Sequence, residues 1–412
     1  MGQISITKIE VRKQIVKLYY EVSEDLRPYF RGGDCYELEY DVDVDQVPES
    51  LLVLPLVCNV LPVIWLTDST LIINSIDRCF FESLDQVKAG YIQMYPMLEF
   101  KGRIQVGQIV ENQTSGNKSI ALFSGGVDAY STLISHLDES PILFTIWGSD
   151  VKRTDIEGWN NIWKLTDVAC QEYGLDKAFV KSNFRELVDE DRLTEIVKGS
   201  GEGWWHGFQH GIAIVSHTIP LAYVFGAKNV YMASTYCYKN KNYTCASDPT
   251  IEGMMRFATS SVIHDRYDLN RQDKLELLCK FHNETGKKIP LHVCWITTNG
   301  ENCCSCEKCY RTMMGILAEG ANPQIYGFSY GNGKIAQIGL DIKYTIKISQ
   351  PNIFFWKDIQ NRFKENVPYM SAPKELRWIY NFNFDKVNEK PSGLRMQIHL
   401  VADKFLKCLG IR

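Results

Sequence analysis

Two adjacent glycines between a short apolar run and a helical pattern constrain the fold more than any other feature. The run at residues 120–123 is typical of a buried strand and leads into Ser124-Gly125-Gly126-Val127-Asp128. Glycine permits a sharp turn and a close approach to the backbone that other residues hinder. A helical pattern follows from about residue 128 to 137. This order predicts the start of a parallel α/β sheet.

Strand and helix patterns continue to alternate after this turn. The predicted strands are residues 142–147, 178–180 and 229–232, and the predicted helices are residues 159–173 and 210–225. Strands that alternate with helices favour crossover connections, which bring successive strands parallel. We therefore predict a doubly wound parallel sheet.

Residues 1–112 have another pattern, in which β-rich runs are separated by turns. The runs predicted as strands are residues 5–11, 15–22, 51–57, 63–66 and 70–73. A polar segment at residues 111–118 marks a boundary, and 412 residues suffice for two or three domains. The predicted organisation is a β-rich accessory domain at 1–115, a central α/β domain at 116–318 and a C-terminal helical extension at 319–412.

The composition excludes several classes of protein. Hydrophobic residues make up 45% and charged residues 23%, and the net charge is −4. These values suit a globular protein and lack the basic surplus of a broad nucleic-acid surface. The longest apolar run, residues 51–66, contains two prolines and an asparagine and is too short to span a bilayer. With no secretory pattern at the N-terminus, we predict a cytoplasmic protein.

The glycine turn has the chemistry of a phosphate cradle. A helix N-terminus presents free N–H groups and the positive end of its dipole, which attract anions. The turn matches neither G-x-x-x-x-G-K-[ST] nor G-x-G-x-x-G. Asp128 would repel a phosphate unless a cation bridges the two, which predicts Mg²⁺ held by Asp128 and phosphate oxygens. The simpler interpretation is a glycine-rich turn with a helix-capping aspartate.

Five of the 13 cysteines lie within residues 294–309. Four of them, with C-x8-C-x2-C-x2-C spacing, are Cys294, Cys303, Cys306 and Cys309. This spacing predicts tetrahedral Zn²⁺, and four protein ligands would make the zinc structural. Cys304 is the fifth candidate, and Cys303 is preferred because it keeps the x2 spacing. Buried free thiols and an iron–sulfur cluster are the alternatives.

The sequence S-G-G-x-D after a strand resembles the pyrophosphatase-loop ATP enzymes. Those enzymes cleave ATP between the α and β phosphates and leave AMP on a substrate oxygen. The resemblance implies catalytic functions for Ser124 and Asp128. The residues expected to contact ATP are Phe123, Ser124, Gly125, Gly126, Val127, Asp128, Ser131 and Trp147.

Two of these assignments have a specific basis. The family motif continues with a hydroxyl residue where this chain has Ala129, and Ser131 is the nearby hydroxyl that could supply the contact. Trp147 ends a predicted strand, where doubly wound sheets bind ligands. A tryptophan of the core is the alternative for that position.

The glycine turn and the cysteine spacing together resemble the 7-cyano-7-deazaguanine synthase (QueC-like) family over residues 119–317. Those enzymes adenylate 7-carboxy-7-deazaguanine, add ammonia and dehydrate the amide to a nitrile. The family's D-C-R-x-E segment corresponds to residues 248–252, which keep Asp248 and Glu252 and lose the arginine. The resemblance implies that these carboxylates bind the base, and a solvated loop with a helix-capping aspartate is the alternative.

The synthase is a shorter protein, and this chain is similar in length to relatives in anti-phage systems such as type IV CBASS and Qat. The resemblance implies that the deazaguanine is joined to the N-terminal amine of a partner protein. Free 7-cyano-7-deazaguanine synthesis is one alternative. A nucleotide-binding scaffold without turnover is another, favoured by Ala129.

Weaker signals complete the candidate site. His206 and His210 are four residues apart in an aromatic segment and could line the pocket or act as a base for an amine. The alternative is an aromatic helix start in the core. A tRNA-thiolating enzyme would need a reactive thiol, such as Cys237 or Cys245, and the charge balance disfavours its RNA surface.

Overall fold

The computed structural model describes residues 2–239, 243–297 and 299–389. The chain forms two compact units, Met1–Asp268 and Leu269–Arg412. The boundaries predicted near residues 115 and 318 fall inside these units. Strand pairing explains the first difference, because it joins the N-terminal region to the α/β region in one sheet.

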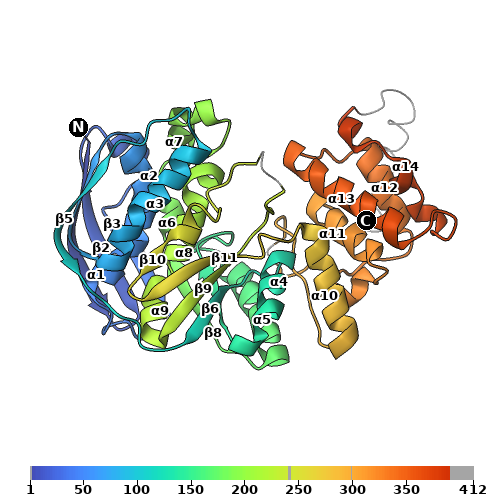
Figure 1. Ribbon diagram of the computed structural model, residues 1–412, viewed down its shortest axis with the longest axis horizontal. Helices are drawn as coiled ribbons and strands as arrows, with labels where there is room; N and C mark the ends of the chain where they lie inside the picture. Colours follow the sequence, from blue (N-terminus) through green and yellow to red (C-terminus); the bar gives the residue numbers. More distant parts are fainter. Residues whose placement is uncertain (1, 240–242, 298, 390–412) are drawn as a thin grey trace. The chain divides into compact units, whose positions relative to one another are not determined.

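The first unit is an α/β structure with one large, mostly parallel sheet (Figure 1). Its strands are β1 Gln3–Arg12, β2 Ile15–Val22, β3 Cys35–Tyr40, β4 Thr70–Asp77, β5 Arg103–Val110, β6 Lys118–Leu122, β7 Ile142–Trp147, β8 Lys177–Ser182, β9 Ala227–Ala233, β10 Arg256–Phe257 and β11 Ser260–Asp265. The strand order is β10-β11-β9-β6-β7-β8-β3-β2-β1-β4-β5. The neighbouring strands β11, β9, β6, β7 and β8 run parallel, which confirms the predicted parallel sheet.

Helices cover both faces of the sheet. Those in the first unit are α1 Glu49–Leu52, α2 Leu54–Leu66, α3 Arg78–Met94, α4 Val127–Ser135, α5 Ile156–Tyr173, α6 Phe184–Leu187, α7 Glu190–Ile196, α8 His210–Ser216 and α9 Ile219–Phe225. Strand order reverses beside β6: the chain continues through α4 to β7 on one side, whereas β9 pairs on the other. Such a reversal leaves a crevice at the carboxyl ends of the strands, where this class of sheet binds ligands.

The N-terminal strands extend the same sheet. β3 pairs antiparallel with β8, with Leu38 opposite Ser182, and β2, β1, β4 and β5 continue outward. Figure 1 shows this blue part of the sheet continuing from the central strands. Alternating burial along β2 and β3 indicates a one-sided core, as expected where helices cover one face only.

The apolar run at residues 51–66 is helical, so the strands predicted at 51–57 and 63–66 are wrong. It forms α1 and α2, and every residue from Leu54 to Trp65 is buried. A fully buried helix lacks the polar face that would produce a helical period, so it resembles a buried strand in sequence. Pro55 occupies the first turn of α2, where a missing N–H costs little. No helix among the described residues is long and apolar enough to cross a membrane.

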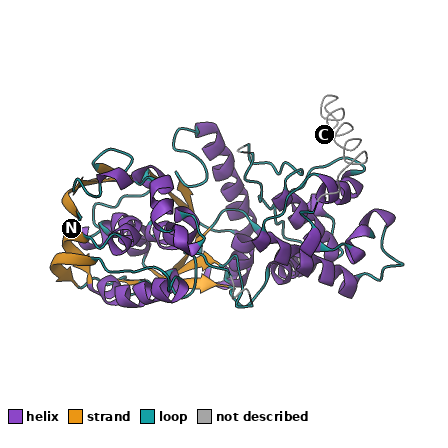
Figure 2. Ribbon diagram, turned by 90° about the horizontal axis from the view of Figure 1, so that it is seen from above, coloured by secondary structure: helices purple, strands orange, loops and turns teal. Residues whose placement is uncertain are grey.

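The second unit consists of helices and loops in its described part (Figure 2). Its helices are α10 Arg271–Thr285, α11 Glu307–Ala318, α12 Lys334–Tyr344, α13 Gln350–Asn366 and α14 Trp378–Asn381. α10, α11 and α13 pack together. The Tyr310 hydroxyl donates to Asp341 at 2.6 Å and links α11 to α12. The predicted C-terminal extension is therefore part of a larger helical unit that begins at Leu269.

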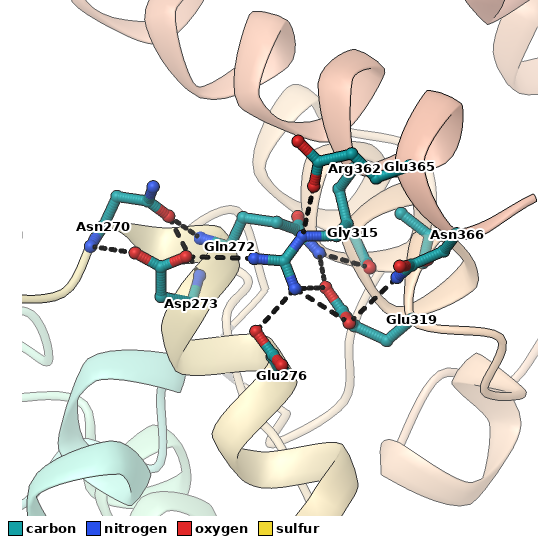
Figure 3. A network of polar contacts seen from close by, with 10 residues as sticks. Asn270, Gln272, Asp273, Glu276, Gly315, Glu319, Arg362, Glu365 and Asn366 are labelled. Atoms are coloured by element: carbon teal, nitrogen blue, oxygen red, sulfur yellow. Dashed lines mark hydrogen bonds and ion pairs between the residues drawn. The ribbon is translucent and has the colours of Figure 1, made fainter.

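A single arginine joins three of these helices (Figure 3). Arg362 of α13 pairs with Asp273 at 3.0 Å and Glu276 at 2.6 Å on α10, and with Glu319 at 3.1 Å after α11. Its side chain is only 14% exposed. Burial raises the pKa of Glu319, and the guanidinium opposes that shift. The network therefore fixes the packing of α10, α11 and α13 through charge-assisted contacts.

Candidate functional site

The glycine turn lies at the strand reversal, and it joins a strand to a helix as the sequence pattern predicts. It connects β6 to α4, and Gly125 has φ of 73°, a left-handed conformation that glycine adopts without steric cost. Gly126 is the N-cap of α4. It has no side chain to bond the first N–H groups of the helix, which have no partner within an α-helix. The turn therefore presents backbone donors at the edge where a ligand would bind.

Two polar side chains lie on this turn. Ser124 is exposed, and Asp128 is partly exposed in the first turn of α4. Phe123 and Val127 are buried. Phe123 donates its N–H to Phe144 at 2.8 Å, so it anchors the turn to the sheet. Of the residues predicted to contact ATP on this turn, Ser124 and Asp128 are therefore exposed or partly exposed, whereas Phe123 and Val127 are buried and hold the turn in place.

Ser131 is fully buried within α4, and its hydroxyl has no hydrogen-bond partner among the described residues. Its carbonyl accepts from Ser135 at 2.8 Å. Ala129 is also buried. Ser131 was expected to supply the hydroxyl that is missing at Ala129. Its hydroxyl lies in the interior and not on the exposed surface of the turn.

Trp147 belongs to an aromatic stack at the end of β7. Its ring lies parallel to Trp159 at 5.2 Å, and Trp159 stacks on Trp163 at 5.6 Å. Its indole N–H donates to the Lys152 carbonyl at 3.0 Å, and the Lys181 ammonium lies 4.2 Å from its ring centre. The half-buried ring is therefore held by protein contacts on several sides.

Asp248 and Glu252 form internal bonds. Glu252 is fully buried and accepts from the Ser247 hydroxyl at 2.9 Å, the Asp248 N–H at 2.6 Å and the His264 ring at 2.5 Å. Asp248 accepts from the Thr250 N–H at 2.9 Å. Glu252 therefore organises the segment around it, and of the two carboxylates only Asp248 is partly exposed.

His206 lies on a π-helical turn, Trp205–Gln209, that leads into α8. Its Nδ1 is 3.0 Å from Glu202, and its side chain is 46% exposed. Single π-helical turns are rare in proteins overall, and those that occur are often found at functional sites. Cys245 hydrogen-bonds to the ring, and this bond, with Glu202, raises the pKa of His206 to about 10.

His210, one turn along the chain, behaves in the opposite way. Burial lowers the pKa of His210 to about 4, and the neighbouring His206 adds to the shift. Its ring packs edge-on against Trp205 at 5.1 Å. At neutral pH the pair therefore consists of a charged His206 and a neutral His210, so of the two only His210 has a ring in the form of a base.

The four predicted cysteine ligands come together in the second unit. The four sulfur atoms all lie within 4.8 Å of one another, and they belong to Cys294, Cys303, Cys306 and Cys309. A tetrahedral zinc with Zn–S distances of about 2.3 Å would hold its sulfurs about 3.8 Å apart. The Sγ atoms of Cys303 and Cys309 are 3.9 Å apart. The set fits a metal such as zinc, and Cys304, the fifth candidate, is outside it.

Backbone N–H groups and the side-chain amide of Asn302 hydrogen-bond to the cysteines of this cluster. The Cys309 N–H donates to Cys306 and the Ser305 N–H donates to Cys303, each at 3.4 Å. Asn302 accepts from the Cys294 N–H at 3.2 Å and donates to the Gly327 carbonyl at 3.0 Å. N–H groups aimed at sulfur stabilise thiolates, the form that binds a metal.

Sequence reasoning missed the contact between His206 and Cys245. It considered each residue separately, the histidine as a base and the cysteine as a reactive thiol. The two lie 39 positions apart, and no short spacing relates them. Glu202, at i−4 from the histidine, was available as a signal because that spacing brings side chains together on one face of a helical segment.

Two hollows lie away from all of these residues. One of about 370 Å³ lies among α13, α14 and the following turn, and its lining includes Lys357, Tyr380 and Asp385. The other, about 240 Å³, is lined by residues of β1, α1 and β4, with Val53. Neither coincides with the glycine turn, so cavity volume does not identify the site.

Comparisons with known proteins do not assign the chain to a family. No protein-family model matches it, and neither the curated proteins nor the solved structures provide a match.

Proposed function

We propose that this protein uses ATP to adenylate the carboxylate of 7-carboxy-7-deazaguanine and then forms an amide with an amine, the N-terminus of a partner protein in anti-phage defence. The observation that carries the proposal is the glycine turn at the strand reversal, with Gly126 as the N-cap of α4 and Asp128 in its first turn. The S-G-G-x-D resemblance supplies the reaction class.

The backbone of the turn would hold the phosphates of ATP. N–H groups at the start of α4 donate to phosphate oxygens, and the exposed Ser124 hydroxyl is placed to add a further donor. Asp128 would hold Mg²⁺, which neutralises phosphate charge and favours departure of pyrophosphate. The substrate carboxylate attacks the α-phosphorus, and the P–O bond to pyrophosphate breaks. The protein contributes mainly position and charge stabilisation.

Recognition of the base would fall to Asp248. The amino and ring N–H groups of a guanine-like edge are donors, for which a carboxylate is a suitable acceptor. Glu252 is already bonded to Ser247, Asp248 and His264. Its contribution to binding is therefore to hold the segment that presents Asp248.

The four cysteines would hold a structural Zn²⁺ in the second unit. A metal with four thiolate ligands has no open position for substrate, so its contribution is to the folding of the loop that precedes α11.

A second candidate function is a nucleotide-binding scaffold. Ala129 replaces the family's hydroxyl residue, and the Ser131 hydroxyl is buried. A turn that lacks one phosphate contact could retain nucleotide without turning it over. Pyrophosphate release distinguishes the two functions.

The test incubates the protein with ATP, Mg²⁺ and 7-carboxy-7-deazaguanine and measures AMP and pyrophosphate. We expect both products from the wild type, and Asp128→Asn should lower their formation by about 100-fold or more. Asp138→Asn, an exposed carboxylate just after α4, is the matched control and should match the wild type. Nucleotide binding without pyrophosphate would support the scaffold and reject the enzyme.

The amine is then identified by mass spectrometry. Adding ammonia should give an amide or nitrile if the protein is a free 7-cyano-7-deazaguanine synthase. Adding a candidate partner protein should instead increase the mass of its N-terminal peptide. The second result is the one that our proposal predicts.

A further inference from the structure

Three side chains of the first unit are arranged as a nucleophile, an imidazolium and a carboxylate that holds the imidazolium. Glu202 lies 3.0 Å from Nδ1 of His206, and Thr244 and Ala246, the chain neighbours of Cys245, hydrogen-bond to Glu202 and to the His206 carbonyl, so Cys245 lies beside this pair. Thr244 in turn hydrogen-bonds to the other oxygen of Glu202 at 2.5 Å. This is the geometry by which a thiol is activated in nucleophilic catalysis.

Backbone bonds hold this cluster in register. The Ala246 N–H donates to the His206 carbonyl at 2.8 Å, which joins the segment after β9 to the π-helical turn. The Ser247 N–H points at Cys245 Sγ, 3.4 Å away. A backbone donor directed at sulfur stabilises negative charge there, as does a neighbouring imidazolium.

The cluster has a buried side and an open side. Cys245 is 7% exposed, whereas the His206 side chain is 46% exposed. The sulfur is therefore shielded from bulk solvent beneath a ring that an incoming amine can reach. A structural thiol would need no such ring or carboxylate.

Topology brings the cluster to the same edge of the sheet as the glycine turn. β6 and β9 are parallel neighbours, so the turn after β6 and the segment after β9 leave the sheet at the same edge. That segment carries Cys245 and packs on the N-terminal end of α8, where Gly211 approaches the Ala246 carbonyl. The acyl transfer proposed below would therefore run between two connections that leave the sheet at one edge.

We propose that Cys245 is a catalytic nucleophile that takes the acyl group from the adenylate as a thioester and passes it to the amine, with His206 as the cation that stabilises its thiolate and Glu202 as a positioning residue. This inference rests on the proposed adenylation and adds a second covalent step to it.

The step balances without a further reactant. The thiolate electron pair forms a bond to the carbonyl carbon, and the C–O bond to AMP breaks, so AMP leaves with that electron pair. A neutral amine then attacks the thioester carbon, the C–S bond breaks and the thiolate returns. The nitrogen releases one proton to water, and the product is an amide.

The raised pKa of His206 is consistent with this sequence. A histidine that stays protonated at neutral pH provides a positive charge beside the sulfur throughout the cycle. Replacement of Glu202 would remove one source of that charge stabilisation while leaving the thiol in place.

The experiment measures two partial reactions in the full chain. Exchange of labelled pyrophosphate into ATP reports adenylation, and intact mass with peptide mapping reports an acyl adduct. With substrate, ATP and Mg²⁺, the wild type should show exchange and a hydroxylamine-sensitive adduct on Cys245. Both Cys245→Ala and Cys245→Ser should lose the adduct and lower amide formation with ammonia more than about 1,000-fold, while exchange persists.

The matched control is Cys237→Ala, a buried cysteine of the same segment, which should form adduct and amide as the wild type does. His206→Gln should slow amide formation about 100-fold. Glu202→Gln should move the titration of the His206 ring toward lower pH, and amide formation should then fall off at a lower pH than in the wild type, which a purely structural carboxylate would not cause.

The outcomes separate the two proposals. Wild-type amide formation by Cys245→Ala, with exchange intact, overturns the thioester and leaves adenylation standing. Absence of exchange in the wild type overturns adenylation, and with it the acyl donor for Cys245. Slow alkylation of Cys245 relative to Cys237 in the wild type would overturn the activated thiol independently of ATP.

Discussion

The cysteine cluster of the second unit and the Cys245–His206–Glu202 cluster of the first unit both depend on thiols, but the chain builds them differently. The first takes all four sulfurs from residues 294–309, a segment of 16 residues. The second joins a π-helical turn to a segment that follows β9, about 40 residues later. One cluster is a property of local spacing, and the other is a property of the fold.

The two clusters also differ in what their chemistry leaves available. Four sulfurs around one metal occupy every tetrahedral position, so such a site stabilises structure and does not attack a substrate. A single sulfur beside a half-exposed imidazolium has no metal ion and has a positive charge that favours its thiolate. In our proposal the same side chain is therefore inert in one unit and reactive in the other because its neighbours differ.

The largest expected effect is the loss of a cysteine from the metal cluster. Cys309→Ser should abolish tight metal binding, because structural zinc sites contribute roughly 10 kcal/mol or more that three ligands do not retain. Metal content measured on the purified chain should fall from one equivalent toward zero. Hydrogen exchange in α11 should accelerate, since Cys309 lies in its first turn.

Cys304→Ser is the control for this change, because that cysteine is buried in the same loop and lies outside the set. It should keep one equivalent of metal, as should Cys245→Ala in the first unit. Equal metal loss from Cys304→Ser and Cys309→Ser would contradict the ligand assignment and the comparison based on it.

Local patterns predicted well wherever short spacing determines the structure. The turn at Gly125 and Gly126 and the four-cysteine set both follow from residues near one another in sequence. The conformation of a glycine and the reach of a C-x2-C hairpin are fixed within a few residues. Long-range neighbours add little to either feature.

Features that depend on distant neighbours were not predictable. The run at residues 51–66 is helical and is buried from Leu54 to Trp65. It therefore lacks the polar face whose period would identify a helix in the sequence. The pairing of β3 with β8 joins positions about 140 residues apart. Glu252 is bonded to His264, a partner that no motif identifies.

Arg362→Met tests whether the second unit depends on its metal cluster alone. Removal of the guanidinium leaves Asp273, Glu276 and Glu319 close together without a counter-charge, which should cost about 3 kcal/mol. Denaturant titration, followed by hydrogen exchange in α10, α11 and α13, measures the loss. Lys357→Met removes an exposed lysine of α13 whose ion pair within the described part of the chain is with Asp385, and it should cost less than about 1 kcal/mol.

His217 provides a pH test of the helix that carries the His206 turn. Burial lowers the pKa of His217 to about 4, whereas an unfolded histidine titrates near 6.5. Between these values only the unfolded chain binds the proton, so the free energy of unfolding should rise with pH from 4 to 6.5. The gain is roughly 3 kcal/mol, is complete above pH 6.5 and is lost as pH falls toward 4.

His217→Gln should lower this slope by about half in urea titrations, because His210, whose pKa burial also lowers to about 4, keeps its own contribution. Ser182→Ala is the control, because it removes a hydroxyl 2.9 Å from Nε2 and keeps the imidazole. It should cost about 1 kcal/mol at every pH and keep the slope. An unchanged slope in His217→Gln would assign the pH dependence to groups other than His217.

The smallest effect tests the glycine turn itself, the local feature of the first unit. Gly125→Ala forces a side chain into a left-handed conformation and should cost about 1–2 kcal/mol. Gly126→Ala should cost less than about 0.5 kcal/mol, because φ of −81° suits any residue. Thermal unfolding compares the two. If the two substitutions lower the free energy of unfolding equally, the left-handed conformation is not the reason for glycine at position 125. Close approach of a ligand would then be the remaining physical reason for both glycines.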